Sequence, residues 1–391
     1  MQLWLRYSIG AQVGLLIGMG LGRFSYTPMV PVLIEVGYLS ESEAGYIGAL
    51  NLGGYVIGAI FTPWLSRHFH EARLIKCSLF LAIICLIGSI FPFGFLWLGL
   101  WRLTIGIIVA IIMILSIAYV TRFAPKHRIA LATSMGFMGV GLGIFFSSAI
   151  LPTFLAHGII WGWVCSAVIG IIAFCIGCWA WHKAPPLDTS KTGYAKRETK
   201  LCLDGKKLII VQGLFSIGLI PHSIYWVDYI VRELRLSIEQ GAFQWMLVGI
   251  GGIIGTIFWG RIADFIGLNI SLVFVFAALA SAAIAPFYFD DFSIIVLSSF
   301  IFGSQPGSAA IVAGRAQQAI GESSMISLWR YMVLSVGAAQ IIGGVFLVEL
   351  FNRTNSYTFI FLIGGASMAL AALICATLSK QPPKLEPRHE V

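Results

Sequence analysis

Long, continuously apolar segments recur along the whole of this 391-residue chain, and they constrain its fold more than any other feature. Each has about the 20 residues that an α-helix needs to cross a hydrocarbon core about 30 Å thick. Strands of a membrane barrel would instead alternate apolar and polar residues. The sequence therefore predicts an all-α polytopic membrane protein with twelve transmembrane helices. The expected spans are 7–34, 43–63, 74–95, 97–121, 129–152, 159–182, 208–231, 241–260, 270–289, 292–314, 324–348 and 356–378.

Composition agrees with a membrane protein and argues against an enzyme. Hydrophobic residues make up 58% of the chain and charged residues 11%, whereas soluble domains carry about 25% charged residues. The seven cysteines lie mostly within apolar runs, which is typical of small buried hydrophobic residues. The sequence has no phosphate-binding loop, no cluster of metal ligands and no nucleophile triad. We therefore expect no catalytic residue, no cofactor and no metal site.

The basic residues behind the formal net charge of +8 are unevenly divided between the two sides of the membrane. Most Lys and Arg residues fall in the loops that would share one side of the membrane with the N-terminus. An excess of basic residues in cytoplasmic loops is the rule for membrane proteins. We therefore expect both termini to be cytoplasmic, and the charge requires no nucleic-acid partner.

The chain divides near its middle. Residues 183–207 form the one sustained polar stretch, which predicts a cytoplasmic linker between six-helix bundles at 1–182 and 208–379, followed by a cytoplasmic tail at 380–391. Residues 56–61 (V-I-G-A-I-F) align with residues 253–258 (I-I-G-T-I-F), each at the end of the second span of its half. Such an internal repeat is typical of secondary transporters, which bind substrate between their repeats.

The loop after the second copy carries a recognisable motif. Residues 260–267 read G-R-I-A-D-F-I-G, which resembles the G-x-L-A-D-x-x-G loop of the major facilitator superfamily. The resemblance implies that Asp264 caps and pairs with neighbouring helix ends and so locks one conformation. The first-half counterpart, residues 63–70, departs from this pattern, with Arg67 where the aspartate would fall.

A second resemblance spans the chain. It rests on G-R-F-x-Y-x-P-x-x-P at 22–31, W-R-x-x-x-G at 101–106, Pro306-Gly307 and Q-x-x-G-G at 340–344. Together these are similar to the YbfB/YjiJ-type branch of the superfamily. The resemblance implies a fold of two six-helix bundles related by a pseudo-two-fold axis, in a multi-pass protein of the bacterial inner membrane.

In that fold, helices 1, 4, 7 and 10 line a central cavity, and each of them carries polar residues here. An ionised side chain at membrane depth is costly and by default marks a pathway. Arginine offers a planar fork of donors that suits a carboxylate, so three intramembrane arginines predict an anionic substrate. The predicted substrate-binding residues are Arg23, Tyr26, Asn51, Tyr55, Arg102, His222, Tyr225, Trp226, Gln305 and Arg330. Tyr and Trp also populate membrane interfaces, so the aromatic residues have a second interpretation.

Asp228, His222 and Asp264 are the predicted coupling and gating residues. His222 has an ordinary pKa near neutrality and is the candidate for proton coupling, although a helical histidine often only forms hydrogen bonds. Asp228 has two possible partners, Arg23 across the cavity or Arg232 one turn away on its own helix.

We therefore expect a monomeric secondary active transporter in the lipid bilayer, working by alternating access. Its substrate would be a small organic anion, such as a carboxylate-bearing metabolite or a siderophore-like compound, taken up with protons. The alternative is a proton-driven exporter of an amphipathic metabolite or drug.

Overall fold

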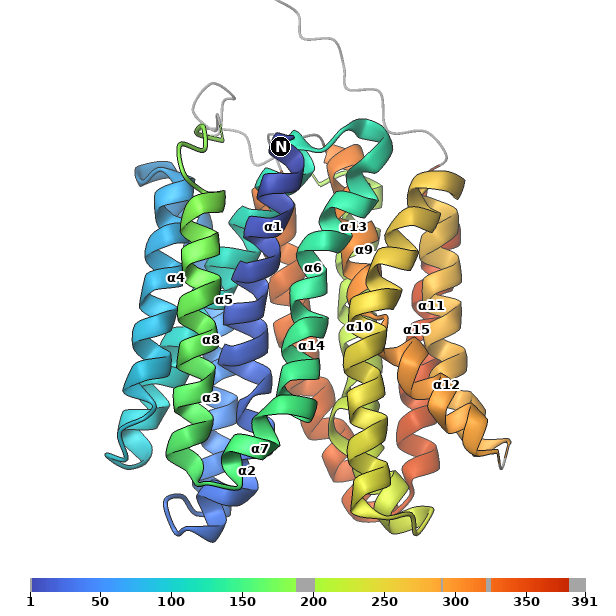
Figure 1. The fold of residues 1–391 in the computed structure, drawn as a ribbon. Coiled ribbons are helices and arrows are strands. Elements are labelled where there is room, and N and C mark those ends of the chain that lie inside the picture. Colours follow the sequence, from blue (N-terminus) through green and yellow to red (C-terminus); the bar gives the residue numbers. More distant parts are fainter. Residues whose placement is uncertain (1, 188–200, 290, 321–324, 380–391) are drawn as a thin grey trace, which may run out of the picture.

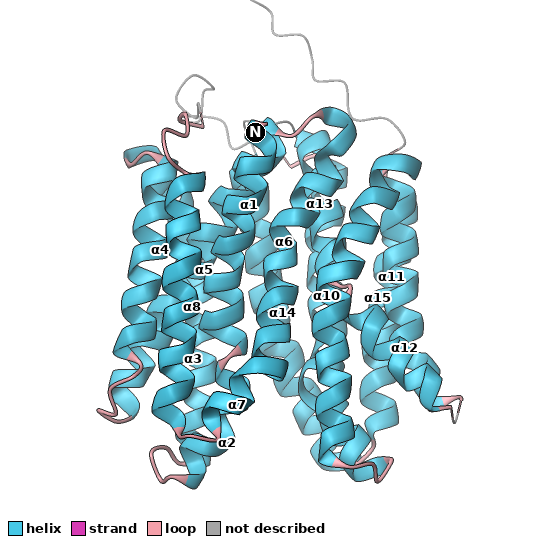
Figure 2. Cartoon of the chain, in the orientation of Figure 1, coloured by secondary structure: helices cyan, strands magenta, loops and turns pink. Residues whose placement is uncertain are grey.

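The protein is an all-helical bundle within the part of the chain that its computed structural model describes, residues 2–187, 201–289, 291–320 and 325–379 (Figures 1 and 2). Most of the expected linker and the tail after residue 379 lie outside this part. The long helices run side by side along a common direction, and the N-terminus lies at one end of the bundle (Figure 1).

The helices fall into a first half and a second half along the chain. The first half contains α1 (Leu3–Leu15), a π-helical segment (Leu16–Phe24), α2 (Tyr26–Glu35), α3 (Glu41–His68), α4 (Glu71–Gly88), α5 (Phe95–Phe123), α6 (Ile129–Phe145), α7 (Leu151–Leu155) and α8 (Ile159–Ala180). The second half contains α9 (Leu203–Asp228), α10 (Ile238–Ile266), α11 (Leu268–Ile284), α12 (Phe292–Gly303), α13 (Pro306–Ile320), α14 (Met325–Thr354) and α15 (Tyr357–Ala376). Short π-helical turns (Phe146–Ile150 and Tyr229–Glu233) follow α6 and α9, and short 3₁₀ turns (Lys126–Arg128 and Ala285–Phe287) precede α6 and follow α11.

Ten helical stretches among the described residues are long and apolar enough to cross a membrane. The other two expected spans correspond to the continuous run from α1 through α2 and to α4, which packs against α5 and α8. The count of twelve crossings stays a prediction, as do the domain boundaries.

The internal repeat is visible in how the second long helix of each half begins. The Ser40 hydroxyl accepts from the Glu43 N–H at the start of α3, and the Glu43 carboxylate accepts in return from the Ser40 N–H at 2.8 Å. Ser237 and Gln240 form the same reciprocal pair at the start of α10. Such a capping box satisfies N–H groups that the first helical turn leaves free. Both halves therefore start this helix with the same local chemistry.

The same two helices also pack alike against a neighbour. A methyl group built on Gly54 of α3 would lie 2.1 Å from the carbonyl oxygen of Leu103 in α5. A methyl group on Gly251 of α10 would lie 2.1 Å from the carbonyl oxygen of Phe300 in α12. Only glycine permits so close an approach of two membrane helices. The repeat read in the sequence thus extends to equivalent helix contacts.

Helices of the two halves pack along two seams, one where α6 meets α10 and α13 and one where α14 meets α3 and α5. α6 packs along α10, where Gly141 and Gly252 meet backbone to backbone. α14 packs against α3, and a methyl group on Gly337 would lie 2.7 Å from the Val56 side chain. The candidate site lies between these two seams.

Candidate functional site

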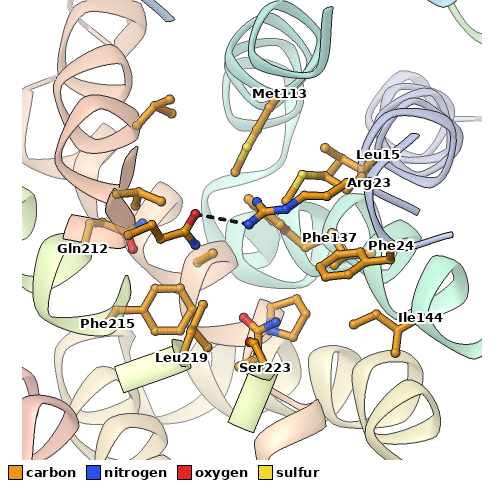
Figure 3. A pocket seen from close by; sticks show the side chains of 18 of the residues that line it. Leu15, Arg23, Phe24, Met113, Phe137, Ile144, Gln212, Phe215, Leu219 and Ser223 are labelled. Carbon is orange, nitrogen blue, oxygen red and sulfur yellow. Dashed lines mark hydrogen bonds between the residues drawn. The ribbon is translucent and has the colours of Figure 1, made fainter. Parts of the chain in front are cut away.

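A cavity of about 140 Å³ lies between the two halves. Its wall is mostly aromatic and aliphatic, contributed by both halves, and Figure 3 shows many of these side chains converging on it. Pockets with a few placed polar groups on an apolar wall are the usual form of small-molecule sites. The polar side chains that line it are Arg23, Tyr55, Gln212, Ser223, Gln305 and Gln340.

Arg23 is the only formally charged side chain among the described residues that line the cavity. It lies in the π-helical segment Leu16–Phe24, and such segments in helices frequently occur at functional sites. Its Nη2 donates to Oε1 of Gln340 in α14 at 3.2 Å, a bond between the two halves (Figure 3). Among the described residues, no carboxylate lies within ion-pair distance of Arg23. The cavity therefore holds a cation that no acid of the described segments neutralises.

Two further predicted residues, Tyr55 and Gln305, reach the cavity wall. The Tyr55 hydroxyl lies 3.0 Å from the Met113 sulfur, so both side chains stand on the same wall. Gln305 lies in the short break between α12 and α13, where the helix restarts at Pro306. These two residues and Arg23 are the predicted binding residues that the structure brings together.

Arg102 lies behind the wall, at 1% exposure. Its Nη1 donates to the carbonyl oxygen of Gly22, the residue before Arg23. The guanidinium carbon lies 4.4 Å from the Tyr26 ring centre and 4.9 Å from the Trp163 ring centre. Asn51 donates to the Arg102 carbonyl oxygen at 3.0 Å. Arg102, Tyr26 and Asn51 thus brace helix contacts within the first half and do not line the cavity.

His222 also stands behind the wall. Its ring stacks on Phe302, a wall residue, with 4.0 Å between ring centres. Ser298 donates its hydroxyl proton to the Ala282 carbonyl oxygen at 2.6 Å, so His222 Nε2 donates to Ser298 at 3.2 Å. The His222 Nδ1 atom is buried and has no hydrogen-bond partner among the described residues.

Two predicted binding residues near His222 on α9, Trp226 and Tyr225, contact neighbouring helices. Trp226 is fully buried and donates to the Ser299 hydroxyl at 2.8 Å. Tyr225 packs against Phe351 of α14 with 5.0 Å between ring centres. Neither residue lines the cavity.

Arg330 and Asp228 do not line the cavity that Arg23 reaches. Arg330 lies over the Tyr331 ring at 4.6 Å and does not line the cavity. The Asp228 carboxylate pairs with Arg232 at 2.8 Å and accepts from the Tyr357 hydroxyl at 2.5 Å. Of the two partners considered for Asp228, the structure shows Arg232.

Asp264 caps a helix of the other half. Its two carboxylate oxygens accept from the backbone N–H groups of Ala130 and Leu131, at 3.1 and 3.0 Å. These residues begin α6, whose free N–H groups and dipole favour a negative charge. The Thr133 hydroxyl adds a bond to the Ala310 carbonyl oxygen of α13 at 3.0 Å. The halves are therefore tied at this end of α6.

Gln212, Ser223 and Gln340 line the cavity but were not predicted. Each is a neutral polar residue in an apolar helix, a weaker signal than a charge because such residues often bond within their own helix. Gln212 and Ser223 lie across the cavity from Arg23 in Figure 3.

Comparison with known proteins identifies the family. Residues 15–376 match the family model described as "Uncharacterised MFS-type transporter YbfB". The chain belongs to this branch of the major facilitator superfamily. It is a multi-pass membrane transporter, and the matched family and structures are transporters rather than enzymes.

Curated relatives are distant. The chain is 24% identical over 292 residues to the cis,cis-muconate transport protein of Acinetobacter baylyi, with 68% of each chain covered. It is 23% identical over 320 residues to the probable sphingolipid transporter spinster homolog 1 of Arabidopsis thaliana. That match covers 71% of this chain and spans 64% of the Arabidopsis protein.

Solved structures share the fold at low identity. The proton:xylose symporter XylE superposes with a TM-score of 0.74 at 16% identity, covering 95% of this chain and 94% of XylE. A bacterial homologue of the iron transporter ferroportin in an outward-facing state gives 0.71 at 13%, covering 96% and 98%. These likenesses bear on the fold alone, and they agree with the predicted major facilitator fold.

Proposed function

We propose that this protein is a secondary active transporter of a small organic anion that carries a carboxylate. The observation that carries the proposal is the cation at Arg23, which lines a cavity between the halves without an acid partner among the described residues. A buried charge is costly unless it is paired. An incoming carboxylate supplies the missing charge and accepts from the guanidinium fork.

Gln340 supports this assignment because it holds the guanidinium without neutralising it. A carboxylate is a better partner for arginine than an amide oxygen, because it is ionised and can accept two parallel N–H bonds from the guanidinium fork. A substrate carboxylate can therefore displace Gln340 or share Arg23 with it. The Acinetobacter relative is named for the transport of cis,cis-muconate, a dicarboxylate, so it is in keeping with the negative charge of the proposed substrate and not with the number of its carboxylates.

The proposal includes uptake coupled to protons, with His222 as the titratable group. His222 stacks on Phe302 of the cavity wall, and its Nδ1 is free among the described residues to accept a proton. The side chains that it contacts in the described part of the chain, Ser298, Trp226, Phe302 and Phe361, carry no charge. His222→Gln should leave downhill uptake intact and abolish accumulation driven by a pH gradient.

Asp264 is the proposed gate. Its bonds to the start of α6 tie the two halves, so opening this end must break them. Loss of such a cap costs about 1 kcal/mol, or about fivefold in a two-state equilibrium. Asp264→Ala should shift the transporter by about that factor toward the form open at this end, measured by distances between spin labels on the two halves. An unchanged distribution would contradict the gate.

The proposed setting is the bacterial inner membrane, with a monomeric protein whose two termini are cytoplasmic. The asymmetric placement of basic loop residues supports this orientation.

Uptake into proteoliposomes tests the function. A panel of labelled carboxylates is offered with and without an inward proton gradient, to wild type, Arg23→Ala, Arg23→Lys and Arg353→Ala. Arg353 is a matched control, because its side chain is 75% exposed and pairs with Glu349 on its own helix. We expect loss of uptake in Arg23→Ala, partial uptake in Arg23→Lys and full uptake in Arg353→Ala. Retained uptake in Arg23→Ala would overturn the assignment of the site to Arg23. Outward movement of the labelled carboxylate, driven by the inward proton gradient, would favour the exporter.

A further inference from the structure

We infer that the site accepts a planar monocarboxylate and discriminates against dicarboxylates. This inference rests on the proposed function and narrows its substrate class. The cavity offers one cation, Arg23, among its described lining residues. One carboxylate neutralises that cation, and a second carboxylate would find no positive partner on the wall.

The far side of the cavity is unsuited to a second charge. Phe215 and Leu219 of α9 lie across the cavity from Arg23 (Figure 3), and Phe302 adds a third apolar group to the wall. A carboxylate pressed against such groups loses its hydration without recovering a hydrogen bond. The polar atoms on that side belong to neutral groups, the Gln212 amide and the Ser223 hydroxyl. These can bond a hydroxyl or carbonyl group of a substrate but cannot neutralise an acid.

Aromatic rings define the shape of the preferred substrate body. Phe24 follows Arg23 directly, and its ring centre lies 5.7 Å from the Arg23 guanidinium carbon. Phe137 and Trp329, one from each half, lie 6.3 Å apart between ring centres, and both line the cavity. Flat conjugated groups pack well against aromatic faces and edges. The geometry therefore favours an aromatic or conjugated acid over a flexible aliphatic one.

Three six-carbon probes separate the contributions of charge. Sorbate is a conjugated diene with one carboxylate, trans,trans-muconate is the same diene with two, and sorbamide is its neutral amide. Their affinities for the purified full-length protein are measured by isothermal titration calorimetry. We expect sorbate to bind at least tenfold more tightly than either of the others, and hexanoate, the saturated acid, to bind several-fold more weakly than sorbate.

Two variants test the cause of the selectivity. Arg23→Gln should remove the preference for sorbate over sorbamide, while Arg353→Gln should keep it. Ser223→Lys adds a second cation on the wall opposite Arg23 and should raise the affinity for muconate relative to sorbate at least tenfold. The gain in muconate binding also shows that this variant is folded.

The outcomes separate this inference from the proposed function. Muconate binding as tightly as sorbate would overturn the monocarboxylate inference and leave an anion transporter standing. Sorbamide binding as tightly as sorbate would overturn anion recognition itself. Equal binding of hexanoate and sorbate would overturn the requirement for a planar body. No binding of sorbate would overturn the inference that the site accepts a planar monocarboxylate.

Discussion

Two arginines in apolar helices, Arg23 and Arg102, lie close together and have opposite surroundings. Arg102 is fully buried between two aromatic rings, and it donates to the carbonyl oxygen of Gly22, the residue before Arg23. Arg23 reaches the cavity, where it donates a hydrogen bond to the Gln340 amide. An arginine at membrane depth is therefore not a binding site in itself. The partners it already has decide whether it can receive a ligand.

A third arginine extends the comparison to a complete ion pair. Arg315 and Asp204 are paired and almost wholly buried, with side-chain exposures of 2% and 8%. Asp204 also accepts from Ser379. Breaking a buried pair by removing one partner costs about 3–5 kcal/mol, because an uncompensated charge remains.

Asp204→Ala should therefore lower the free energy of unfolding by about 3–5 kcal/mol, measured by chemical unfolding in detergent. The double variant Asp204→Ala/Arg315→Met should recover part of the loss, since it removes the unpaired charge. An Asp204→Ala variant as stable as wild type would show that the ion pair is dispensable. It would also contradict the view that Arg315 depends on its acid partner.

Arg102→Lys should have the next largest effect. Lysine keeps the charge but loses the flat stacking between two rings and the forked donor, a loss of about 2 kcal/mol. The melting temperature in detergent should fall, whereas Arg353→Lys should leave it unchanged. Carboxylate affinity in Arg102→Lys should fall much less than in Arg23→Gln. The reverse ranking would assign ligand binding to Arg102.

Asp228→Asn should have the smallest effect. Its partner Arg232 is 77% exposed, and surface pairs contribute about 0.2–1 kcal/mol. The asparagine can still accept from the Tyr357 hydroxyl. Proteoliposome uptake should stay within about twofold of wild type, consistent with so small a free energy. Complete loss of uptake would instead give Asp228 a part in the transport cycle.

The sequence was sufficient for the fold because hydrophobic length and local chemistry determine it. Apolar runs predicted helices, and the repeat of 56–61 at 253–258 anticipated equivalent contacts at Gly54 and Gly251. The family and the all-helical fold are confirmed. The capping boxes at Ser40 and Ser237 were local signals that could have been read as well.

The site was only partly predictable, because a helix position does not give the direction of its side chain. Arg23 reaches the cavity from a π-helical segment, whose altered turn changes which residues face inward. Arg102 and His222 were both expected in the cavity, yet one faces Tyr26 and Trp163, and the other lies behind Phe302. These orientations depend on packing between distant segments.

Gln340 is a residue of the candidate site that the sequence did not predict. It is a neutral residue on α14, and its bond to Arg23 joins positions near opposite ends of the chain. Nothing local in the sequence indicates that partner. Long-range placement, rather than residue type, made it part of the site.

The most direct test of the account is the affinity of Arg23→Gln for a carboxylate. Truncating one partner of a buried hydrogen-bonded charge pair costs about 2–5 kcal/mol, which corresponds to at least about thirtyfold in affinity. Calorimetric titration with sorbate should show at least that loss for Arg23→Gln and none for Arg353→Gln, with both variants eluting as wild type in gel filtration. Wild-type affinity of Arg23→Gln for sorbate would contradict the claim that Arg23 is the anchor for the anion.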